Sequence, residues 1–304
     1  MISVIVPVYN EEESLEEFNK RTLNVLRSHS KNFEIIYVDD GSTDQSLSII
    51  KNFSLKSKEV KFISFFRNFG QHAAVLSGFK YSKGDHIITL DADLQNPPEE
   101  IPEFLNHVES NYDVIAGKRK NRKDNFLRKF FSNIMNRIIS KITNVELSDY
   151  GCMMRMYSRN IINVILENFD KTIYVPAFAS WISKNILEIE IKHEKRNFGK
   201  TKYSLMNLTQ QAFDLITAYT YKPLQFLLIL SLLVLFMIFT FLFFIYVGLI
   251  NFININNVFL LYSLLILIVS IILVFLSILS EYVLRIHKNS RRLPLYIIRE
   301  KNLG

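Results

Sequence analysis

The chain has 304 residues, with 36 Lys and Arg against 29 Asp and Glu, a net charge of +7 and a hydrophobic content of 49%. Its single cysteine, Cys152, excludes an internal disulfide and any metal site built from several cysteines. The first apolar run, residues 2–9, is short, lacks a basic leader and is followed by a polar, acidic segment, so no signal peptide is expected.

The N-terminal part of the chain alternates apolar runs with helical patterns. Strands are predicted over residues 2–9, 33–38, 60–66, 87–90 and 113–116, and helices over residues 69–81 and 99–109. Asn10 is the expected N-cap of a helix that begins at Glu11. Ser42 or Thr43 is the expected N-cap of a second helix, which carries Leu47. The alternation predicts an α/β fold with a doubly wound, mostly parallel sheet. Ligands of such sheets bind beyond the carboxyl ends of the strands, so residues 7–11, 39–40 and 91–95 should converge on one cleft.

The run Asp91-Ala-Asp-Leu-Gln95 directly follows a predicted buried strand, and Pro97 and Pro98 stop that strand from continuing. Two carboxylates one residue apart, with an amide two residues further on, form an all-oxygen site. Such a site suits Mg²⁺ or Mn²⁺, which keep open positions for phosphate oxygens. The sequence therefore predicts metal ligands at Asp91, Asp93 and Gln95, against the simpler alternative of a charged turn.

Residues 118–141 contain nine Lys or Arg and a single acidic residue, Asp124. Apolar residues recur in pairs every four residues from Phe126 to Ile142, which predicts an amphipathic helix over about residues 125–143. A basic amphipathic helix of this kind favours a membrane interface, and an ordinary helix packed on the sheet is the alternative. Residues 204–222 form a second, less basic amphipathic stretch that is predicted to connect to the C-terminal part.

Two uncharged apolar segments follow, residues 226–250 and 258–279. As helices they measure about 37 and 33 Å, enough to span a bilayer. The turn between them carries no basic residue, whereas the segment after them carries six Lys or Arg, so both termini and the catalytic part should be cytoplasmic. The predicted organisation is a catalytic domain over 1–203, the connector over 204–222, two transmembrane helices within 223–280 and a basic cytoplasmic tail over 281–304.

Four motifs resemble the signature set of family 2 inverting glycosyltransferases. They are Val6-Pro-Val-Tyr-Asn-Glu11, Val38-Asp-Asp-Gly-Ser-Thr-Asp44, Asp91-Ala-Asp-Leu-Gln-Asn-Pro-Pro98 and Gly199-Lys-Thr-Lys-Tyr-Ser204. With the hairpin included, the chain resembles the polyprenyl-phosphate glycosyltransferases, such as dolichyl-phosphate mannose synthase. The run Asp149-Tyr-Gly-Cys-Met-Met-Arg155 resembles the undecaprenyl-phosphate formamido-arabinose transferase branch. The resemblance implies a nucleotide-diphospho-sugar transferase fold of the GT-A type.

The resemblance also implies roles for individual residues. Nucleotide binding falls to Pro7, Tyr9, Glu11, Asp39, Asp40 and Asp91, and phosphate or acceptor binding to Arg119, Arg122, Arg128, Arg196 and Lys202. The expected catalytic residues are Asp149, Arg155 and Lys202. For Arg119, Arg122 and Arg128, contact with solvent or lipid headgroups is an equal alternative. His72 is interpreted as a surface histidine at a helix start, with contact to the donor sugar as the alternative.

The general base is where the sequence departs from the family pattern. Relatives often carry an Asp two residues before the Arg that corresponds to Arg155, and here that position is Met153. Asp149 is the nearest remaining carboxylate, and capping of a turn before Gly151 is an equal alternative role for it. A phosphate monoester is mostly dianionic at pH 7 and needs no base, unlike a sugar hydroxyl. The missing Asp therefore favours a phosphate acceptor.

The predicted function is inverting transfer of a sugar from a nucleotide sugar, expected to be UDP-linked, to undecaprenyl phosphate at the cytoplasmic membrane face. The product would be a polyprenyl monophosphate sugar for modification of cell-envelope glycans. Expected partners are the donor, the lipid acceptor and the bilayer; a homo-oligomer is left open and nucleic acid is not expected. The alternatives are an inactive nucleotide-sugar-binding scaffold and a processive polysaccharide synthase. The synthase normally needs a Gln-x-x-Arg-Trp motif, yet the only tryptophan, Trp181, lies in Ala-Ser-Trp-Ile.

Overall fold

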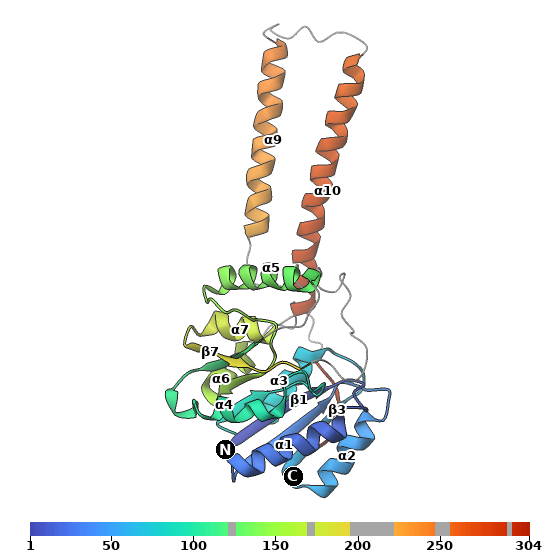
Figure 1. Cartoon of the computed structure of the whole chain (residues 1–304). Helices are drawn as coiled ribbons and strands as arrows, with labels where there is room; N and C mark the ends of the chain where they lie inside the picture. Colours follow the sequence, from blue (N-terminus) through green and yellow to red (C-terminus); the bar gives the residue numbers. More distant parts are fainter. Residues whose placement is uncertain (121–125, 169–173, 195–221, 247–255, 291–293) are drawn as a thin grey trace. The chain divides into compact units, whose positions relative to one another are not determined.

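A computed structural model describes residues 1–120, 126–168, 174–194, 222–246, 256–290 and 294–304 (Figure 1). The chain divides into two compact units. The first comprises residues 1–212 together with residues 293–304, and the second comprises residues 213–292. The domain limits predicted above remain predictions.

The first unit contains an eight-stranded sheet in the order β7-β5-β6-β4-β1-β2-β3-β8. The strands are β1 (Ile2–Val8), β2 (Phe33–Asp39), β3 (Val60–Phe65), β4 (His86–Thr89), β5 (Val114–Arg119), β6 (Arg155–Ser158), β7 (Ile186–Ile191) and β8 (Ile298–Asn302). Strands β4, β1, β2 and β3 run parallel, as do β5 and β7, while β6 and β8 are antiparallel to their neighbours. The predicted mostly parallel α/β sheet is confirmed.

Helices cover both faces of the central strands, which explains why β2 and β3 are buried along their whole length. The helices of this unit are α1 (Leu15–His29), α2 (Ser46–Lys56), α3 (Gln71–Tyr81), α4 (Ile101–Leu105), α5 (Phe126–Thr143), α6 (Arg159–Asn168) and α7 (Val175–Ile182). Val4, Val6 and Val8 of β1 join the core cluster that contains Leu15 of α1. Ile5, which points to the other face, meets Gly78 of α3, where an added Cβ would lie only 2.2 Å from the isoleucine Cγ2.

Two predicted helix starts are wrong. Asn10 is not an N-cap, because α1 begins at Leu15 and Asn10 has a left-handed backbone with φ of 53°. Likewise α2 begins at Ser46, after Gln45 at its N-cap position, so neither Ser42 nor Thr43 caps it. These polar side chains instead connect two loops, as described below.

The predicted helix over 99–109 is broken into three short pieces. They are η1 (Pro98–Glu100), α4 and η2 (Val108–Ser110). Pro102 lies within the first turn of α4, where its missing N–H is tolerated, but the chain continues helically for only five residues.

Helix α5 forms where the amphipathic pattern predicts it and packs on α7 (Figure 1). Ile139 of α5 is buried, so part of its apolar face is used within the first unit. Contact of α5 with a membrane interface stays a prediction. The second amphipathic stretch, residues 204–222, lies outside the described residues except for its last one.

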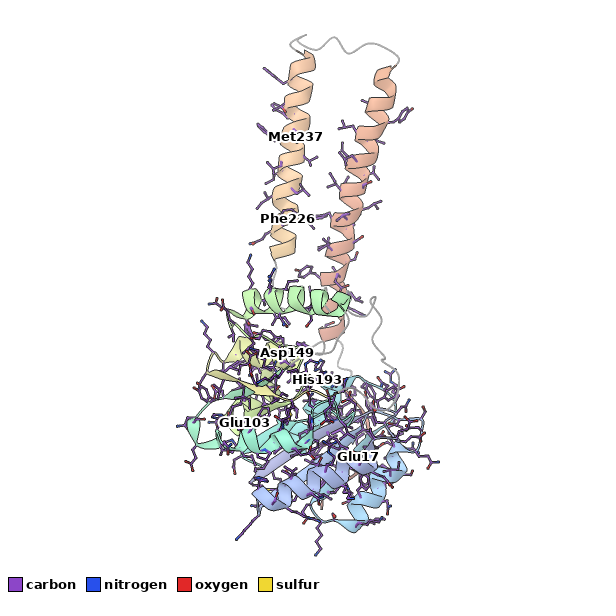
Figure 2. All side chains as sticks on the ribbon, in the orientation of Figure 1. Glu17, Glu103, Asp149, His193, Phe226 and Met237 are labelled. Atoms are coloured by element: carbon purple, nitrogen blue, oxygen red, sulfur yellow. The ribbon has the colours of Figure 1, made fainter. Side chains whose placement is uncertain are left out.

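The second unit contains α9 (Lys222–Tyr246) and α10 (Asn256–Ser290). One window, Leu267–Leu284 of α10, is long and apolar enough to cross a membrane, with a mean hydropathy of 2.5 and no buried residue. Helix α9 exposes large apolar side chains such as Phe226 (64%) and Met237 (68%), which Figure 2 labels. The described residues contain one such window, so the two-helix hairpin remains a prediction.

The segment after α10 returns to the first unit. Tyr296 stacks on Phe65 with ring centroids 4.9 Å apart, and Phe66 N donates to Ile297 O at 3.1 Å. Residues 298–302 then form β8 along β3, and Lys51 of α2 pairs with Glu300 at 2.7 Å. The expected basic tail over 281–304 is thus the end of α10 followed by an edge strand.

Candidate active site

The loops that follow β1 and β2 are joined by hydrogen bonds. Asn10 Oδ1 accepts from Thr43 N at 2.8 Å, and Asn10 N donates to Ser42 Oγ at 3.0 Å. Glu11 N donates to Ser46 Oγ at 2.9 Å. The left-handed backbone of Asn10 is therefore fixed by partners from the neighbouring loop, and it holds Glu11 at the carboxyl edge of the sheet.

Pro7 and Tyr9 are the other predicted nucleotide-binding residues of this segment. Pro7 is half-buried in β1 opposite Val38 of β2, and half-buried Tyr9 follows the strand directly. Both therefore flank the edge at which Glu11 lies.

Asp39 is buried at the end of β2 and both of its carboxylate oxygens are hydrogen-bonded. Oδ1 accepts from Ser42 N at 3.1 Å and Oδ2 accepts from Ser64 Oγ at 2.8 Å. These contacts fix the turn that contains Gly41, where φ is 69° and an added Cβ would lie 2.4 Å from the Arg67 carbonyl carbon. Only glycine fits there.

Asp40 is also buried, and it holds the loop before α3. Its oxygens accept from Phe69 N at 2.7 Å and Gly70 N at 2.9 Å. Burial raises the pKa of the Asp40 carboxyl to about 6, and these two backbone donors oppose that shift. Asp39 and Asp40 thus shape the nucleotide-side loops, and their predicted contact with a base stays a prediction.

The predicted metal loop follows β4 directly. Gln95 N donates to Asp93 Oδ1 at 3.1 Å, and buried Leu94 has a left-handed backbone with φ of 60°. Asp91 Oδ1 accepts from the side-chain amide of Gln71, the first residue of α3, at 2.6 Å. A strained non-glycine residue between two candidate ligands is typical of a loop whose shape serves a site.

The electrostatics of Asp91 show which groups surround it. Burial and the neighbouring Asp93 carboxylate raise the pKa of Asp91 to about 7. Arg119 at the end of β5 and the Gln71 amide oppose the rise, while Glu11 adds to it. Groups from three segments that follow or end strands therefore act electrostatically on Asp91: Glu11 after β1, Asp93 after β4 and Arg119 at the end of β5.

Arg119 forms a buried, two-pronged ion pair with Asp149. Its Nε donates to Asp149 Oδ2 at 2.6 Å and its Nη2 donates to Oδ1 at 2.8 Å. Only 11% of the Arg119 side chain and 3% of the Asp149 side chain are exposed. The carboxylate of Asp149, labelled in Figure 2, is thus engaged by a guanidinium whose charge also acts on Asp91.

Arg155 lies wholly inside the protein, at the start of β6. Its Nε donates to Cys152 O at 3.0 Å, and its Nη2 donates to the carbonyl oxygens of Asp149 and Tyr150 at 3.2 and 3.3 Å. These contacts brace the loop that carries Asp149. The predicted catalytic role of Arg155 stays a prediction.

Four predicted residues belong to segments that are not fully described. Arg122, Arg196 and Lys202 lie outside the described residues, and Arg128 lies in α5 but its side chain is not described. The nearest described anchor is Glu194, whose N–H donates to Gln95 O at 2.9 Å. The segment that carries Arg196 and Lys202 therefore follows a residue bound to the metal loop.

His72 differs from its interpretation as a surface residue. It is half-buried beside Gln71 in α3, and its ring meets the Tyr174 ring edge-on at 4.9 Å. Burial lowers the pKa of His72 to about 4, so the imidazole is neutral at pH 7. Gln71 itself was missed, although its place next to His72 at a helix start was the available signal.

Two comparisons with known proteins, one with family models and one with curated relatives, agree on the kind of protein. The family described as glycosyl transferase family 2 matches residues 3–166. The undecaprenyl-phosphate 4-deoxy-4-formamido-L-arabinose transferase of Shewanella sediminis (strain HAW-EB3) is 42% identical over 231 residues, 76% of this chain and 70% of that protein.

Solved structures share the fold at low sequence identity. Glucosyl-3-phosphoglycerate synthase from Mycobacterium tuberculosis, solved with Mn²⁺, uridine diphosphate and phosphoglyceric acid, has a TM-score of 0.52 at 14% identity over 71% of this chain and 78% of that chain. Mannosyl-3-phosphoglycerate synthase from Rubrobacter xylanophilus has a TM-score of 0.54 at 10% identity over 72% of each chain.

Proposed function

The chain belongs to glycosyl transferase family 2 and is a glycosyltransferase, and from this premise we propose that it transfers a sugar from a nucleotide sugar to undecaprenyl or another polyprenyl phosphate. The observation that carries the proposal is that Arg119, at the end of β5, lies at the same edge of the sheet as Asp91 and Asp93, which follow β4, because both strands pair antiparallel with β6. The carboxylates suit a cation on a donor diphosphate, and the guanidinium suits a second anion. A phosphate acceptor provides that anion.

The residues around Asp91 fit a hard divalent cation. Within the part of the chain that the structure describes, no group of three His, Cys, Asp or Glu is placed to hold a metal ion. The candidate ligands are the Asp91 and Asp93 carboxylates and the side-chain amide of Gln95. Mg²⁺ or Mn²⁺ prefers such oxygen ligands and would stabilise the charge of a departing nucleoside diphosphate. Asp91, Asp93 and Gln95 would hold the ion, and a bound cation would favour the ionised form of Asp91.

The state of Asp149 supports an acceptor that arrives ionised. Its two oxygens accept hydrogen bonds from Arg119, which leaves it poorly placed to take a proton from a hydroxyl group. A phosphate monoester has its second pKa near 6 and is already a nucleophile at neutral pH. We infer in-line attack of a phosphate oxygen on the anomeric carbon, with inversion of configuration.

The segment after Glu194 supplies further cations in this proposal. Arg196 comes two residues after the backbone contact of Glu194 with Gln95. Arg196 and Lys202 would neutralise the leaving diphosphate, since cationic donors aimed at developing charge lower the barrier. Pro7, Tyr9 and Glu11 would bind the nucleoside at the β1 edge.

The topology of the sheet supports a membrane hairpin with the catalytic unit on one side. Residues before 213 and after 292 belong to the same compact unit, because β8 pairs with β3. Any crossings between them must be even in number. We therefore infer two spans, over 226–250 and 258–279, with both termini cytoplasmic by the distribution of basic residues.

The test is release of nucleoside diphosphate from a panel of nucleotide sugars by the purified full chain. UDP-4-deoxy-4-formamido-L-arabinose is the first donor to try, on the strength of the relative's name. Release should require undecaprenyl phosphate, should fail with undecaprenol and should stop when EDTA removes divalent cations. No release with any donor would favour the inactive scaffold, and a growing polymer would favour the processive synthase.

A further inference from the structure

Two side chains of α5 contact the loop that carries Asp149: Thr143 Oγ1 lies 3.0 Å from the Tyr150 hydroxyl, and Asn136 binds the loop's backbone. Asn136 of α5 donates from Nδ2 to Ser148 O at 2.6 Å, and its Oδ1 accepts from Tyr150 N at 3.2 Å. Asn136 is buried, with 8% of its surface exposed. A single amide thus binds the backbone on both sides of Asp149.

Further contacts orient the same loop from the sheet side. Glu188 of β7 accepts from Ser148 N at 2.7 Å and from Asp149 N at 3.1 Å. An added Cβ at Gly151 would lie 3.3 Å from Arg119 Nη2, so a larger residue would press on the guanidinium. The Asp149 carboxylate therefore has one defined position, and its two hydrogen bonds orient the Arg119 guanidinium.

We propose that Asn136 is a positioning residue for the acceptor phosphate. It fixes Asp149, and Asp149 fixes the guanidinium of Arg119 at the sheet edge where Asp91 follows β4. A long arginine side chain loses much rotamer freedom when it binds an anion, and holding it in advance lowers that cost. The inference rests on the proposed function, because it assigns Arg119 to a phosphate.

The position of Asn136 on α5 gives the proposal a second consequence. The amphipathic helix and the phosphate-binding arginine share one hydrogen-bonded connection, from Asn136 through Asp149 to Arg119. A lipid acceptor reaches the site along the membrane surface that α5 is predicted to contact. A displacement of α5 would therefore move the arginine that receives the phosphate.

The experiment measures binding of farnesyl phosphate and of farnesol to the full chain in detergent by calorimetry. The difference between the two probes isolates the phosphate group. In Asn136→Ala we expect farnesyl phosphate to bind about tenfold more weakly, as for the loss of one charge-assisted contact, with farnesol and UDP binding unchanged. Asn168→Ala is the matched control, because exposed Asn168 of α6 donates to Val164 O within its own helix.

A double-variant comparison separates positioning from simple support of the fold. If Asn136 acts through Arg119, adding Asn136→Ala to Arg119→Lys should cause little further loss, whereas independent effects would add. Asn136→Asp keeps the acceptor for Tyr150 N and loses the donor to Ser148 O, so it serves if Asn136→Ala does not fold. We expect Asn136→Asp also to weaken farnesyl phosphate selectively.

Unchanged farnesyl phosphate affinity in a folded Asn136 variant, or additive losses in the double variant, would overturn the inference. These outcomes differ from failure of the proposed function. If the unaltered protein binds farnesyl phosphate no better than farnesol, the proposed phosphate acceptor is wrong and the inference falls with it. If the unaltered protein prefers farnesyl phosphate to farnesol and the Asn136 variants keep the same preference, the inference alone fails.

Discussion

Among single residues, the two carboxylates of the metal loop should be far less replaceable than Asp149. We predict that Asp91→Asn or Asp93→Asn lowers kcat at least about 10²-fold, because each would remove charge that acts on the leaving diphosphate. Asp149→Asn should lower turnover only about tenfold, by loosening Arg119. Nucleoside diphosphate release measures all three.

The control for these substitutions is Asp85→Asn. Asp85 is exposed and pairs with the N-terminal amine at 2.9 Å, at the start of β4 rather than at its carboxyl end. Turnover in this variant should stay at the unaltered level. Equal losses in Asp91→Asn and Asp149→Asn would instead make Asp149 part of the chemistry.

Gln71 is a residue whose role only the folded chain reveals. Its amide meets Asp91, which is 20 residues away in sequence. We predict that Gln71→Ala lowers kcat about tenfold, since a hydrogen bond to a charged group contributes about 1.5–3 kcal/mol. Gln45→Ala, which alters an exposed side chain, should leave kcat unchanged, and a similar loss in both would remove the special role of Gln71.

At the scale of elements, a buried charge network joins β1, β2, β3 and the turn before β4. Glu34 accepts from Ser3 Oγ at 2.5 Å, Lys61 Nζ at 2.6 Å and Lys83 N at 2.6 Å. Desolvation disfavours ionisation of Glu34, but these donors together lower the pKa of its carboxyl below the ordinary value. The network lies at the end of the strands opposite the site, so its task is stability.

We predict that Glu34→Gln destabilises the first unit by about 3 kcal/mol at pH 7, because it leaves buried Lys61 without its partner. The pKa of Glu34 is lower in the folded protein than in the unfolded chain, where it is about 4.5. The stabilisation is therefore complete above the unfolded-state pKa and is lost as the pH falls through the folded-state pKa. The variant should therefore lose less stability than the unaltered chain on acidification.

Thermal unfolding followed between pH 7 and pH 3 gives this comparison. Glu59→Gln is the control, because Glu59 forms a surface pair with Arg27 at 3.7 Å and such pairs contribute less than about 1 kcal/mol. An effect of Glu34→Gln as small as that of Glu59→Gln would show that the network does not stabilise the sheet.

Strands with an apolar run were predictable, whereas mixed or charged ones were not. Strands β1 to β5 carry apolar runs, which indicate burial, and the end of β4 located the metal loop. Strand β6 reads Arg-Met-Tyr-Ser and lacks such a run, although β4 has the same length, and β8 reads Ile-Arg-Glu-Lys-Asn, which has the charge pattern of a protected edge. Their places depend on pairing with strands far away in sequence.

The same limit applies to the site. The candidate metal ligands Asp91 and Asp93 are close together in the sequence, so sequence alone locates them. Asn10 resembled a helix cap because its residue type suits that role, yet its partner is Thr43 in another loop. Arg119 and Asp149 are 30 residues apart in sequence, with a helix between them, so no local sequence pattern predicts their ion pair.

For the whole molecule, the segment after α10 closes the sheet and should contribute to its stability. We predict that Tyr296→Ala destabilises the first unit by about 2 kcal/mol, through loss of the stack on Phe65 and of half-buried aromatic surface. Ile297→Ala, at a position 46% exposed, should have a much smaller effect.

Rates of thermal inactivation in detergent compare these variants. Full resistance of Tyr296→Ala to heat would mean that the segment merely lies along β3. A truncation after residue 292 extends the test, since it exposes the β3 edge that β8 covers and should promote aggregation.

The pairing of β8 with β3 also sets an order of events during synthesis. Residues 60–65 leave the ribosome long before residues 298–302, and residues 213–292 emerge between them. The sheet of the catalytic unit can therefore be completed only after the apolar helices have been translated. If those helices enter the bilayer as they emerge, the enzyme acquires its final strand only once it is already anchored.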